Sequence, residues 1–212
     1  MIVQRKVPMI FIRYENWKSY LRYYPVTSLI LAANVIMFLL LTFNGGSGDA
    51  LTQLKYGALT NVEPFASEWW RLFSSMFLHH DLTHLISNCF AILVFAPPLE
   101  RLLGHWRYAL LYLASGLVGN LISLEIYRQS MENHLSVGAS GAIYGVYGAF
   151  LYIALLQRHL MDTSSRQTLY SLLIIGVAFS LMVPQVNWMA HFGGLIGGFF
   201  LYGLIIRVLK RR

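Results

Sequence analysis

The sequence predicts an all-α integral membrane protein in which six helices cross the bilayer. Its 212 residues are 57% hydrophobic and 12% charged, and its mean hydropathy is +0.55. A soluble domain carries roughly twice that share of charge. Six apolar stretches that reach or approach membrane-spanning length follow one another along the chain, at about residues 26–43, 81–95, 108–126, 140–156, 169–183 and 188–206.

The segment before the first span, residues 1–25, contains five basic residues among Tyr, Trp and Phe. This composition indicates a cytoplasmic arm that lies among the lipid headgroups, with a disordered tail as the alternative. Because the arm has no apolar core followed by a cleavage site, we expect no signal peptide. The first span carries no charge and is long enough to cross a hydrocarbon core of about 30 Å.

A long loop, residues 44–71, follows the first span. Phe65, Trp69 and Trp70 lie in this loop, and aromatic residues prefer the membrane interface. We therefore expect a structured hairpin at the interface rather than a loop that extends into water.

The second helix is predicted to start at Asp81, because aspartate is a good N-cap residue. It runs towards Phe95, and the Pro97-Pro98 pair either ends it or allows it to continue to Gly104 at the membrane edge.

The remaining spans follow in order, and Pro184 is expected to end the fifth. The sixth leads into a basic tail. The length fits one membrane domain, so the chain divides into an arm (1–25), a six-helix domain (26–208) and a tail (209–212).

Basic residues indicate how the helices are oriented. Six spans place both termini on one side, and that side carries thirteen of the sixteen Lys and Arg residues; the others are Lys55, Arg71 and Arg128. Because cytoplasmic loops are enriched in basic residues, both termini are expected in the cytoplasm. The same loops account for the net charge of +7, so we expect no nucleic-acid partner. No internal repeat is visible, which disfavours a transporter built from inverted repeats.

Three groups of polar side chains lie within the predicted spans, where such groups are costly and usually functional. His84 and Asn88 are four residues apart on the second helix and so share a face, as do Ser140 and Tyr144 on the fourth. His191 lies near the start of the sixth. From a cytoplasmic N-terminus these three helices all begin on the outer side, so their polar residues lie at a similar depth and open to the same face.

Glycines surround Ser140 and also follow His191. Taken alone, the stretch from Gly138 to Gly145 reads as a small-residue packing seam between membrane helices. Gly194 and Gly198 likewise allow the sixth helix to pack closely. If the sixth helix packs against residues 138–148, His191 reaches Ser140.

The chemistry that follows from this contact is nucleophilic. A serine hydroxyl reacts once a base takes its proton, and histidine is the usual base. We therefore predict Ser140 as nucleophile and His191 as general base and acid. The Asn88 amide, the His84 ring and the Ser140 backbone N–H would hold the oxyanion. No acidic residue lies near these positions in the spans, which indicates a dyad, and Tyr144 would orient the imidazole by stacking or hydrogen bonding.

Bland alternatives exist for the same residues. His84 and Asn88 are also compatible with a structural hydrogen bond between helices. His79, His80 and His84 are also compatible with a zinc site. No cysteine, and no carboxylate other than Asp81, completes a zinc ligand set. We therefore expect no metal and no cofactor, and assign no role to the remaining loop histidines: His105, His134 and His159.

These motifs resemble the rhomboid family of intramembrane serine proteases over nearly all of the chain after the arm. Gly138-Ala139-Ser140-Gly141 is similar to the family's Gly-x-Ser-Gly nucleophile motif. Ala190-His191, followed by Gly194 and Gly198, is similar to the family's sixth helix. The other matches are His84-x-x-x-Asn88, the upstream His79, Trp70-Arg71, Glu100-x-x-x-Gly104 and Tyr144.

The resemblance implies a six-transmembrane-helix rhomboid bundle whose long first loop lies partly in the membrane. The fifth helix and the loop over the active site would act as a lateral gate and a cap. It also implies that Tyr144 stacks beneath His191 and that His84 and Asn88 form the oxyanion hole. Trp70 and Arg71 would anchor the first loop.

The expected activity is that of a serine endopeptidase that cuts transmembrane segments of other membrane proteins near their outer ends. The alternative is a non-proteolytic rhomboid-like factor that binds membrane proteins and escorts them. The short chain indicates a prokaryotic plasma membrane protein. The sequence leaves the substrate, the cleavage-site preference and the oligomeric state open.

Overall fold

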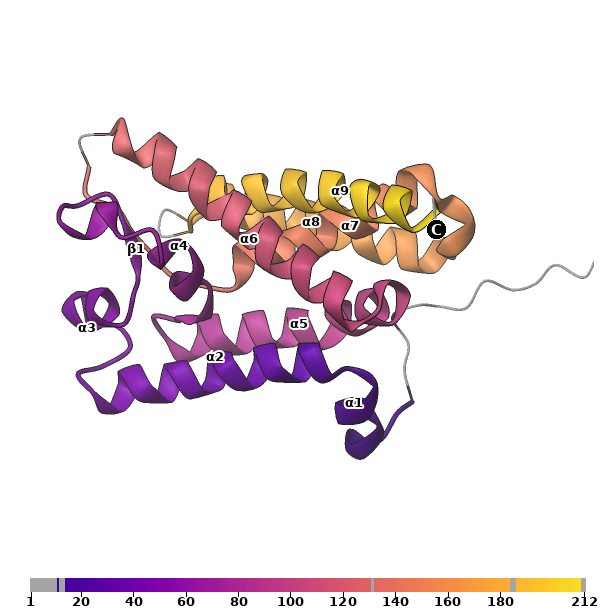
Figure 1. Cartoon of the computed structure of the whole chain (residues 1–212), viewed down its shortest axis with the longest axis horizontal. Helices are drawn as coiled ribbons and strands as arrows, with labels where there is room; N and C mark the ends of the chain where they lie inside the picture. Colours follow the sequence, from indigo (N-terminus) through magenta and orange to yellow (C-terminus); the bar gives the residue numbers. More distant parts are fainter. Residues whose placement is uncertain (1–10, 12–13, 131, 184–185, 211–212) are drawn as a thin grey trace, which may run out of the picture.

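The computed structural model describes residues 11, 14–130, 132–183 and 186–210, and Figure 1 shows how its elements are arranged. Among these residues, five helices are long and apolar enough to cross a membrane, and α7 is a sixth, shorter apolar helix. The helical membrane fold predicted from the sequence is confirmed.

The elements follow one another along the described chain as α1 (Trp17–Tyr23), α2 (Pro25–Phe43), α3 (Ala50–Lys55), β1 (Leu59–Thr60), η1 (Phe65–Ser67), α4 (Arg71–Ser74), η2 (Ser75–Phe77), α5 (Leu82–Leu103), α6 (His105–Arg128), β2 (Leu135–Ser136), α7 (Ser140–Leu156), η3 (Arg158–Leu160), α8 (Thr163–Met182) and α9 (Trp188–Lys210).

Several helices extend beyond the spans predicted from hydropathy. α6 begins at His105 rather than at residue 108, α8 begins at Thr163 rather than at 169, and α9 continues to Lys210 rather than ending near 206. Polar turns continue a helix past the hydrocarbon core, because long basic side chains reach the interface and a cap satisfies the first N–H groups. Asp162 provides that cap for α8 by accepting from Ser165 N. Pro184 and residues 211–212 lie outside the described residues.

α5 continues through Pro97 and Pro98 and ends at Leu103. Of the two possibilities that the sequence left open, the longer helix is therefore the correct one. Gly104 then ends the helix with φ of 78°, a left-handed value that glycine adopts without strain. Asp81 caps its start, as predicted, by accepting from His84 N.

Glu100, near the end of α5, is fully buried and caps a different helix. Its carboxylate accepts from Val26 N at 3.0 Å, from Thr27 N at 2.9 Å and from the Thr27 hydroxyl at 2.6 Å. His105 Nδ1 lies 2.7 Å from Oε1, the same oxygen that accepts from Val26 N. The first N–H groups of α2 are thus satisfied by a side chain of α5, which fastens the two helices together.

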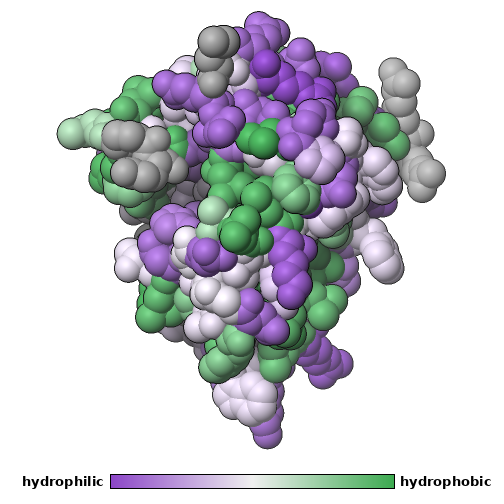
Figure 2. Space-filling view, turned by 90° about the vertical axis from the view of Figure 1, so that its left-hand side faces the viewer, coloured by the Kyte–Doolittle hydropathy of each residue, from purple (hydrophilic) through white to green (hydrophobic). Residues whose placement is uncertain are grey.

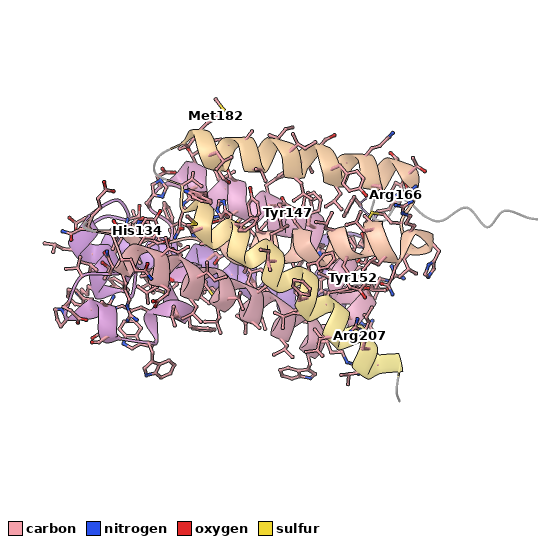
Figure 3. All side chains as sticks on the ribbon, turned by 90° about the horizontal axis from the view of Figure 1, so that it is seen from above. His134, Tyr147, Tyr152, Arg166, Met182 and Arg207 are labelled. Atoms are coloured by element: carbon pink, nitrogen blue, oxygen red, sulfur yellow. The ribbon has the colours of Figure 1, made fainter. Side chains whose placement is uncertain are left out.

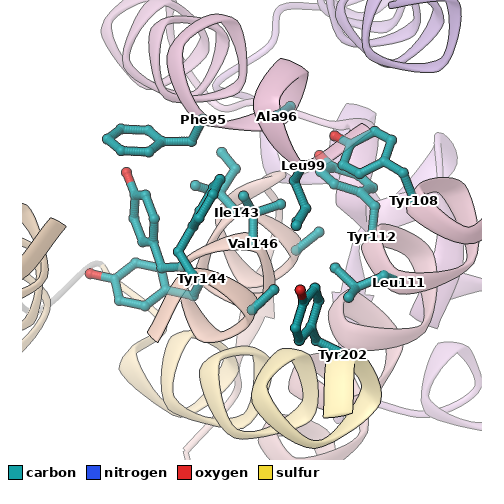
Figure 4. Packing of buried hydrophobic residues seen from close by; sticks show 14 of the residues in the cluster. Phe95, Ala96, Leu99, Tyr108, Leu111, Tyr112, Ile143, Tyr144, Val146 and Tyr202 are labelled. Carbon is teal, nitrogen blue, oxygen red and sulfur yellow. The ribbon is translucent and has the colours of Figure 1, made fainter. Parts of the chain in front are cut away.

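α7 is the most deeply buried helix of the bundle and packs most closely against α9 and α6. Two glycines of α9 make this contact close, because a Cβ at Gly194 would overlap the carbonyl oxygen of Gly141, and one at Gly198 that of Gly145. Figure 4 shows the buried residues around α7, among them Ile143 and Val146, packed against side chains of α5, α6 and α9.

The first loop is built from short elements rather than extended chain. β1 pairs antiparallel with β2, with Leu59 opposite Ser136. Arg71 is buried, donates to the carbonyls of Leu54 and Ala58 and pairs with Glu68. These bonds hold the loop against the bundle, and its position relative to a membrane stays a prediction.

The described part of the arm contains α1 and Phe11, whereas residues 1–10 and 12–13 lie outside the described residues. The Phe11 ring packs edge-on against Phe95 and Phe150, with centroids 4.9 and 5.2 Å away. In Figure 1, α1 and the last turns of α9 lie at the same end of the bundle, as six crossings require.

α8 lies along one edge of the bundle, with Met182 towards the end that carries His134 and Arg166 at the opposite end (Figure 3). Its outward side chains are exposed: Ile174 by 70%, for example. Such a side is apolar because it faces lipid rather than water.

Candidate active site

Ser140 and His191 come into contact where α7 and α9 begin. Ser140 is the first residue of α7, and His191 lies in the first turn of α9 with 8% of its surface exposed. The Nε2 atom of His191 lies 2.7 Å from the Ser140 hydroxyl oxygen. A nucleophile and a base at hydrogen-bond distance are what proton abstraction from a serine needs.

Asn187 fixes the start of α9 and therefore the position of His191. Its side-chain oxygen accepts from Ala190 N at 3.0 Å. Its amide donates to the hydroxyls of Ser123 on α6 and Ser136 on β2, at 2.7 and 2.8 Å. An asparagine directly before an apolar helix is a recognisable cap, so the sequence contained this signal.

Ser180 of α8 contacts the other ring nitrogen of His191, a partner that the sequence did not reveal. Its hydroxyl oxygen lies 2.7 Å from His191 Nδ1, 2.7 Å from the Gly176 carbonyl and 3.1 Å from the Tyr144 hydroxyl. A serine hydroxyl has one hydrogen and two lone pairs. Since a carbonyl only accepts, Ser180 donates to Gly176 and accepts from His191 and Tyr144.

This arrangement selects one tautomer of neutral His191. The proton lies on Nδ1, where Ser180 accepts it, and the lone pair of Nε2 points at Ser140. That is the tautomer a general base requires. Ser180 thus occupies the place that a carboxylate takes in a Ser-His-Asp triad.

Tyr144 stacks on His191, with ring centroids 4.3 Å apart and an angle of 9° between the rings. Its ring limits rotation of the imidazole, and its hydroxyl bonds to Ser180 rather than to the histidine. The geometry therefore combines the two roles considered for Tyr144 from the sequence: it stacks directly and bonds indirectly.

Gly138 and His84 form the opposite wall of the site. Gly138 has φ of 134°, a value that L side chains rarely adopt. A Cβ added there would lie 2.7 and 2.8 Å from Cε1 and Nε2 of His84, and 3.6 Å from the Ser140 hydroxyl. The Nε2 edge of His84 therefore faces the same point as the nucleophile, and only glycine leaves room for it.

Asn88, one turn further along α5, is buried with 6% of its surface exposed. Its amide nitrogen has no hydrogen-bond partner among the residues that the structure describes. An unpaired buried donor is costly unless something else binds to it. Together with the free N–H at the start of α7, it is a second donor available to a bound group.

Two histidines before α5 complete this wall. His79 is fully buried and packs edge-on against His84, with centroids 4.9 Å apart. Burial lowers the pKa of His79 to about 3, so its ring is neutral. His80 lies on the other side of His84, with the two Nδ1 atoms 2.8 Å apart.

The surface above these groups is mixed. Figure 2 views the end of the molecule that carries α3 and β1, and shows polar residues over much of it with hydrophobic residues grouped between them. A cavity of about 320 Å³ lies at the other end, lined by Tyr23, Tyr24, Glu100, Arg101, Gly104 and His105. It is therefore separate from the Ser140 site.

The structure thus brings seven of the site residues predicted from the sequence to one end of the bundle: His79, His84, Asn88, Gly138, Ser140, Tyr144 and His191. Gly194 and Gly198 lie further along α9 and act through the helix contact. Asn187 and Ser180 were not anticipated.

Comparison with known proteins yields one family. The model of the rhomboid domain matches residues 66–208. YdcA of Bacillus subtilis (strain 168), whose name describes a candidate rhomboid protease, is 36% identical over 207 residues, covering 96% of this chain and 100% of YdcA.

Two further relatives are longer than this chain. The rhomboid protease GluP of Bacillus subtilis is 37% identical over 174 residues, which are 82% of this chain and 33% of GluP. RHOMBOID-like protein 5 of Arabidopsis thaliana is 35% identical over 158 residues, which are 74% of this chain and 50% of that protein.

Proposed function

The chain belongs to the rhomboid family, and from this premise we propose that it is an intramembrane serine endopeptidase that uses Ser140 and His191 as a catalytic dyad. The observation that carries the proposal is the 2.7 Å contact between His191 Nε2 and the Ser140 hydroxyl, with Ser180 holding the proton of the same imidazole on Nδ1.

The reaction begins with attack of Ser140 on the scissile carbonyl. His191 Nε2 takes the hydroxyl proton as the new C–O bond forms, and the resulting imidazolium keeps its Nδ1–H on Ser180. The imidazolium then gives the proton to the leaving amine, which completes the acyl-enzyme. Water, deprotonated by the same nitrogen, releases the acyl group and restores the hydroxyl.

The negative oxygen of the tetrahedral intermediate needs donors that are already in place. There are three candidates: the Nε2 edge of His84 beside Gly138, the Ser140 N–H at the start of α7, and the Asn88 amide one turn further along α5 from His84. Their fixed positions on α5 and α7 require no rearrangement during the reaction. The expected loss on removing one such donor is about 10²–10³-fold in kcat.

The substrates we propose are membrane proteins cut within a transmembrane segment. α7 has 17 residues and is about 26 Å long at 1.5 Å per residue, shorter than a hydrocarbon core of about 30 Å. In this proposal the first residue of α7, Ser140, lies below the outer membrane surface. With both termini in the cytoplasm, the site opens on the outer side of a prokaryotic plasma membrane.

The test is co-expression with a type I model substrate that has one transmembrane segment. Cleavage by the parent should be lost in Ser140→Ala and in His191→Ala, and kept in Ser171→Ala, an exposed serine of α8. Substrate that is bound by the parent but never cut would favour the escort factor instead. Cleavage by either dyad variant at the parental rate would end the proposal.

A further inference from the structure

A chain of three side chains leads from the surface to the His84 ring. The Asp81 carboxylate lies 2.7 Å from Nε2 of His80, and Nδ1 of His80 lies 2.8 Å from Nδ1 of His84. The side chains of His80 and Asp81 are about half exposed, at 47% and 51%. His84 then presents its Nε2 edge to Gly138 and the Ser140 hydroxyl.

The hydrogens on this chain can be counted. The Asp81 carboxylate only accepts, so His80 keeps a hydrogen on Nε2. One hydrogen must also lie between the two facing Nδ1 atoms, because two lone pairs at 2.8 Å repel. If the histidine pair carries no net charge, these are its only two N–H hydrogens, and Nε2 of His84 has none.

One additional proton changes the result. The pair then has three N–H hydrogens, two of them held by Asp81 and by the Nδ1–Nδ1 contact. The third must lie on Nε2 of His84, whichever of the two rings carries the positive charge. Only in this state can His84 donate to an oxyanion beside Ser140.

We propose that His80 and Asp81 are positioning residues that determine whether His84 presents an N–H or a lone pair to the oxyanion. This inference rests on the proposed function and deepens it. The dyad and the oxyanion wall need opposite tautomers, since His191 must present a bare Nε2 and His84 a protonated one. Ser180 sets the first, and the Asp81–His80 pair sets the second.

The titratable groups that face His80 come from its own segment and from α5. They are the neutral His79 ring and the His84 ring, and the Asp81 carboxylate supplies a negative charge against His80 Nε2. On the loop between α2 and α3, the Ser47 hydroxyl donates to the His80 carbonyl at 3.1 Å. The charged residue of that loop, Asp49, has its carboxylate bonded to Thr52 N. Asp81 is therefore the carboxylate that balances the extra proton.

The first measurement reads the tautomer directly, without catalysis. In the full chain labelled with ¹⁵N-histidine in detergent micelles, the His84 Nε2 resonance should change from protonated to unprotonated as the pH rises. In His80→Asn the amide nitrogen Nδ2, bonded to Cγ as Nδ1 is in histidine, donates to His84 Nδ1 at every pH. The resonance of His84 Nε2 should therefore keep the position of a protonated nitrogen. A resonance that titrates identically in both proteins overturns the proposal.

The second measurement follows cleavage of a transmembrane peptide in proteoliposomes against pH. The parent should lose at least about tenfold in kcat as the pH rises and the pair gives up its extra proton, the value of one hydrogen bond to the intermediate. His80→Asn and Asp81→Asn should lack this loss, because an amide can donate where the carboxylate cannot. The asparagine introduced by Asp81→Asn still caps α5, and His159→Asn, at the opposite end of the bundle, is the control that keeps the loss.

The two outcomes separate this inference from the proposed function. Equal losses at every pH in both amide variants would indicate a structural role and overturn the inference. A His84 tautomer that responds as described, in a protein that cuts no substrate, would support the positioning role and defeat the protease proposal.

Discussion

Replacing Ser180 with alanine tests how α8 supports the dyad. Ser180 is buried, with 5% of its surface exposed, and its hydroxyl accepts hydrogen bonds from His191 Nδ1 and from Tyr144. Alanine removes that acceptor and leaves two buried donors without a partner. The Nδ1–H tautomer of His191 then loses its stabilisation, and the alternative tautomer points an N–H at Ser140.

The expected loss follows from the cost of an unpaired buried donor, about 1–3 kcal/mol. Because 1.4 kcal/mol corresponds to a factor of ten in rate, kcat should fall about 10- to 100-fold. Ser180 contacts the base and not the substrate position, so the KM should change little. Ser180→Thr keeps a hydroxyl and should recover most of the rate.

The assay is initial-rate cleavage of a transmembrane peptide in proteoliposomes at several substrate concentrations, which separates kcat from KM. The exposed Ser171→Ala on the same helix is the matched control. Thermal unfolding of each variant shows whether the fold is intact. A Ser180→Ala protein with the parental kcat, or one whose loss lies entirely in KM, would refute the role assigned to this serine.

Three other predictions concern the fold and the site wall. Gly138→Ala should lower the unfolding free energy by about 1–3 kcal/mol and remove most of the cleavage activity, because its Cβ would lie 2.7 Å from the His84 ring. An alanine variant with the parental stability and the parental cleavage rate would contradict the close contact. Glu100→Gln should lower the unfolding free energy by about 1–3 kcal/mol in detergent, since an amide cannot accept all the bonds that end on this carboxylate. Glu125→Gln, with a 63% exposed side chain, is the control, and equal stabilities would count against the capping role. His79 has a folded-state pKa of about 3, below the unfolded value of 6.5. The unfolded chain therefore binds the proton at higher pH than the folded protein does, and the free energy of unfolding should fall as the pH drops below 6.5. The fall should reach about 2 kcal/mol by pH 5; His79→Phe should show a flatter dependence, and superimposable curves would contradict the buried neutral ring.

The spans could be predicted because crossing a bilayer demands a run of apolar residues, which hydropathy detects directly. Helix ends were harder to predict, since the turns at His105 and Thr163 are polar and resemble loops. α5 passes through Pro97 and Pro98, where a local rule favours a break. Its continuation depends on packing across the bundle, which a local pattern does not contain.

The dyad could be predicted from Ser140 and His191 because each is a costly polar residue at the start of an apolar helix. Ser180 was missed, since one serine near the end of α8 has nothing in its neighbourhood that distinguishes it. Its importance arises from contact with a ring eleven residues away along the chain. His80 was considered only as a metal ligand, because its contact with His84 depends on ring orientation.

Covalent labelling of the protein in membranes by a fluorophosphonate, with the adduct located by peptide mass spectrometry, tests directly whether His191 activates Ser140. We expect an adduct on Ser140 in the parent, none in Ser140→Ala, and a much slower reaction in His191→Ala, where no base takes the hydroxyl proton. An adduct on another serine, or labelling of His191→Ala at the parental rate, would contradict the claim that His191 activates Ser140.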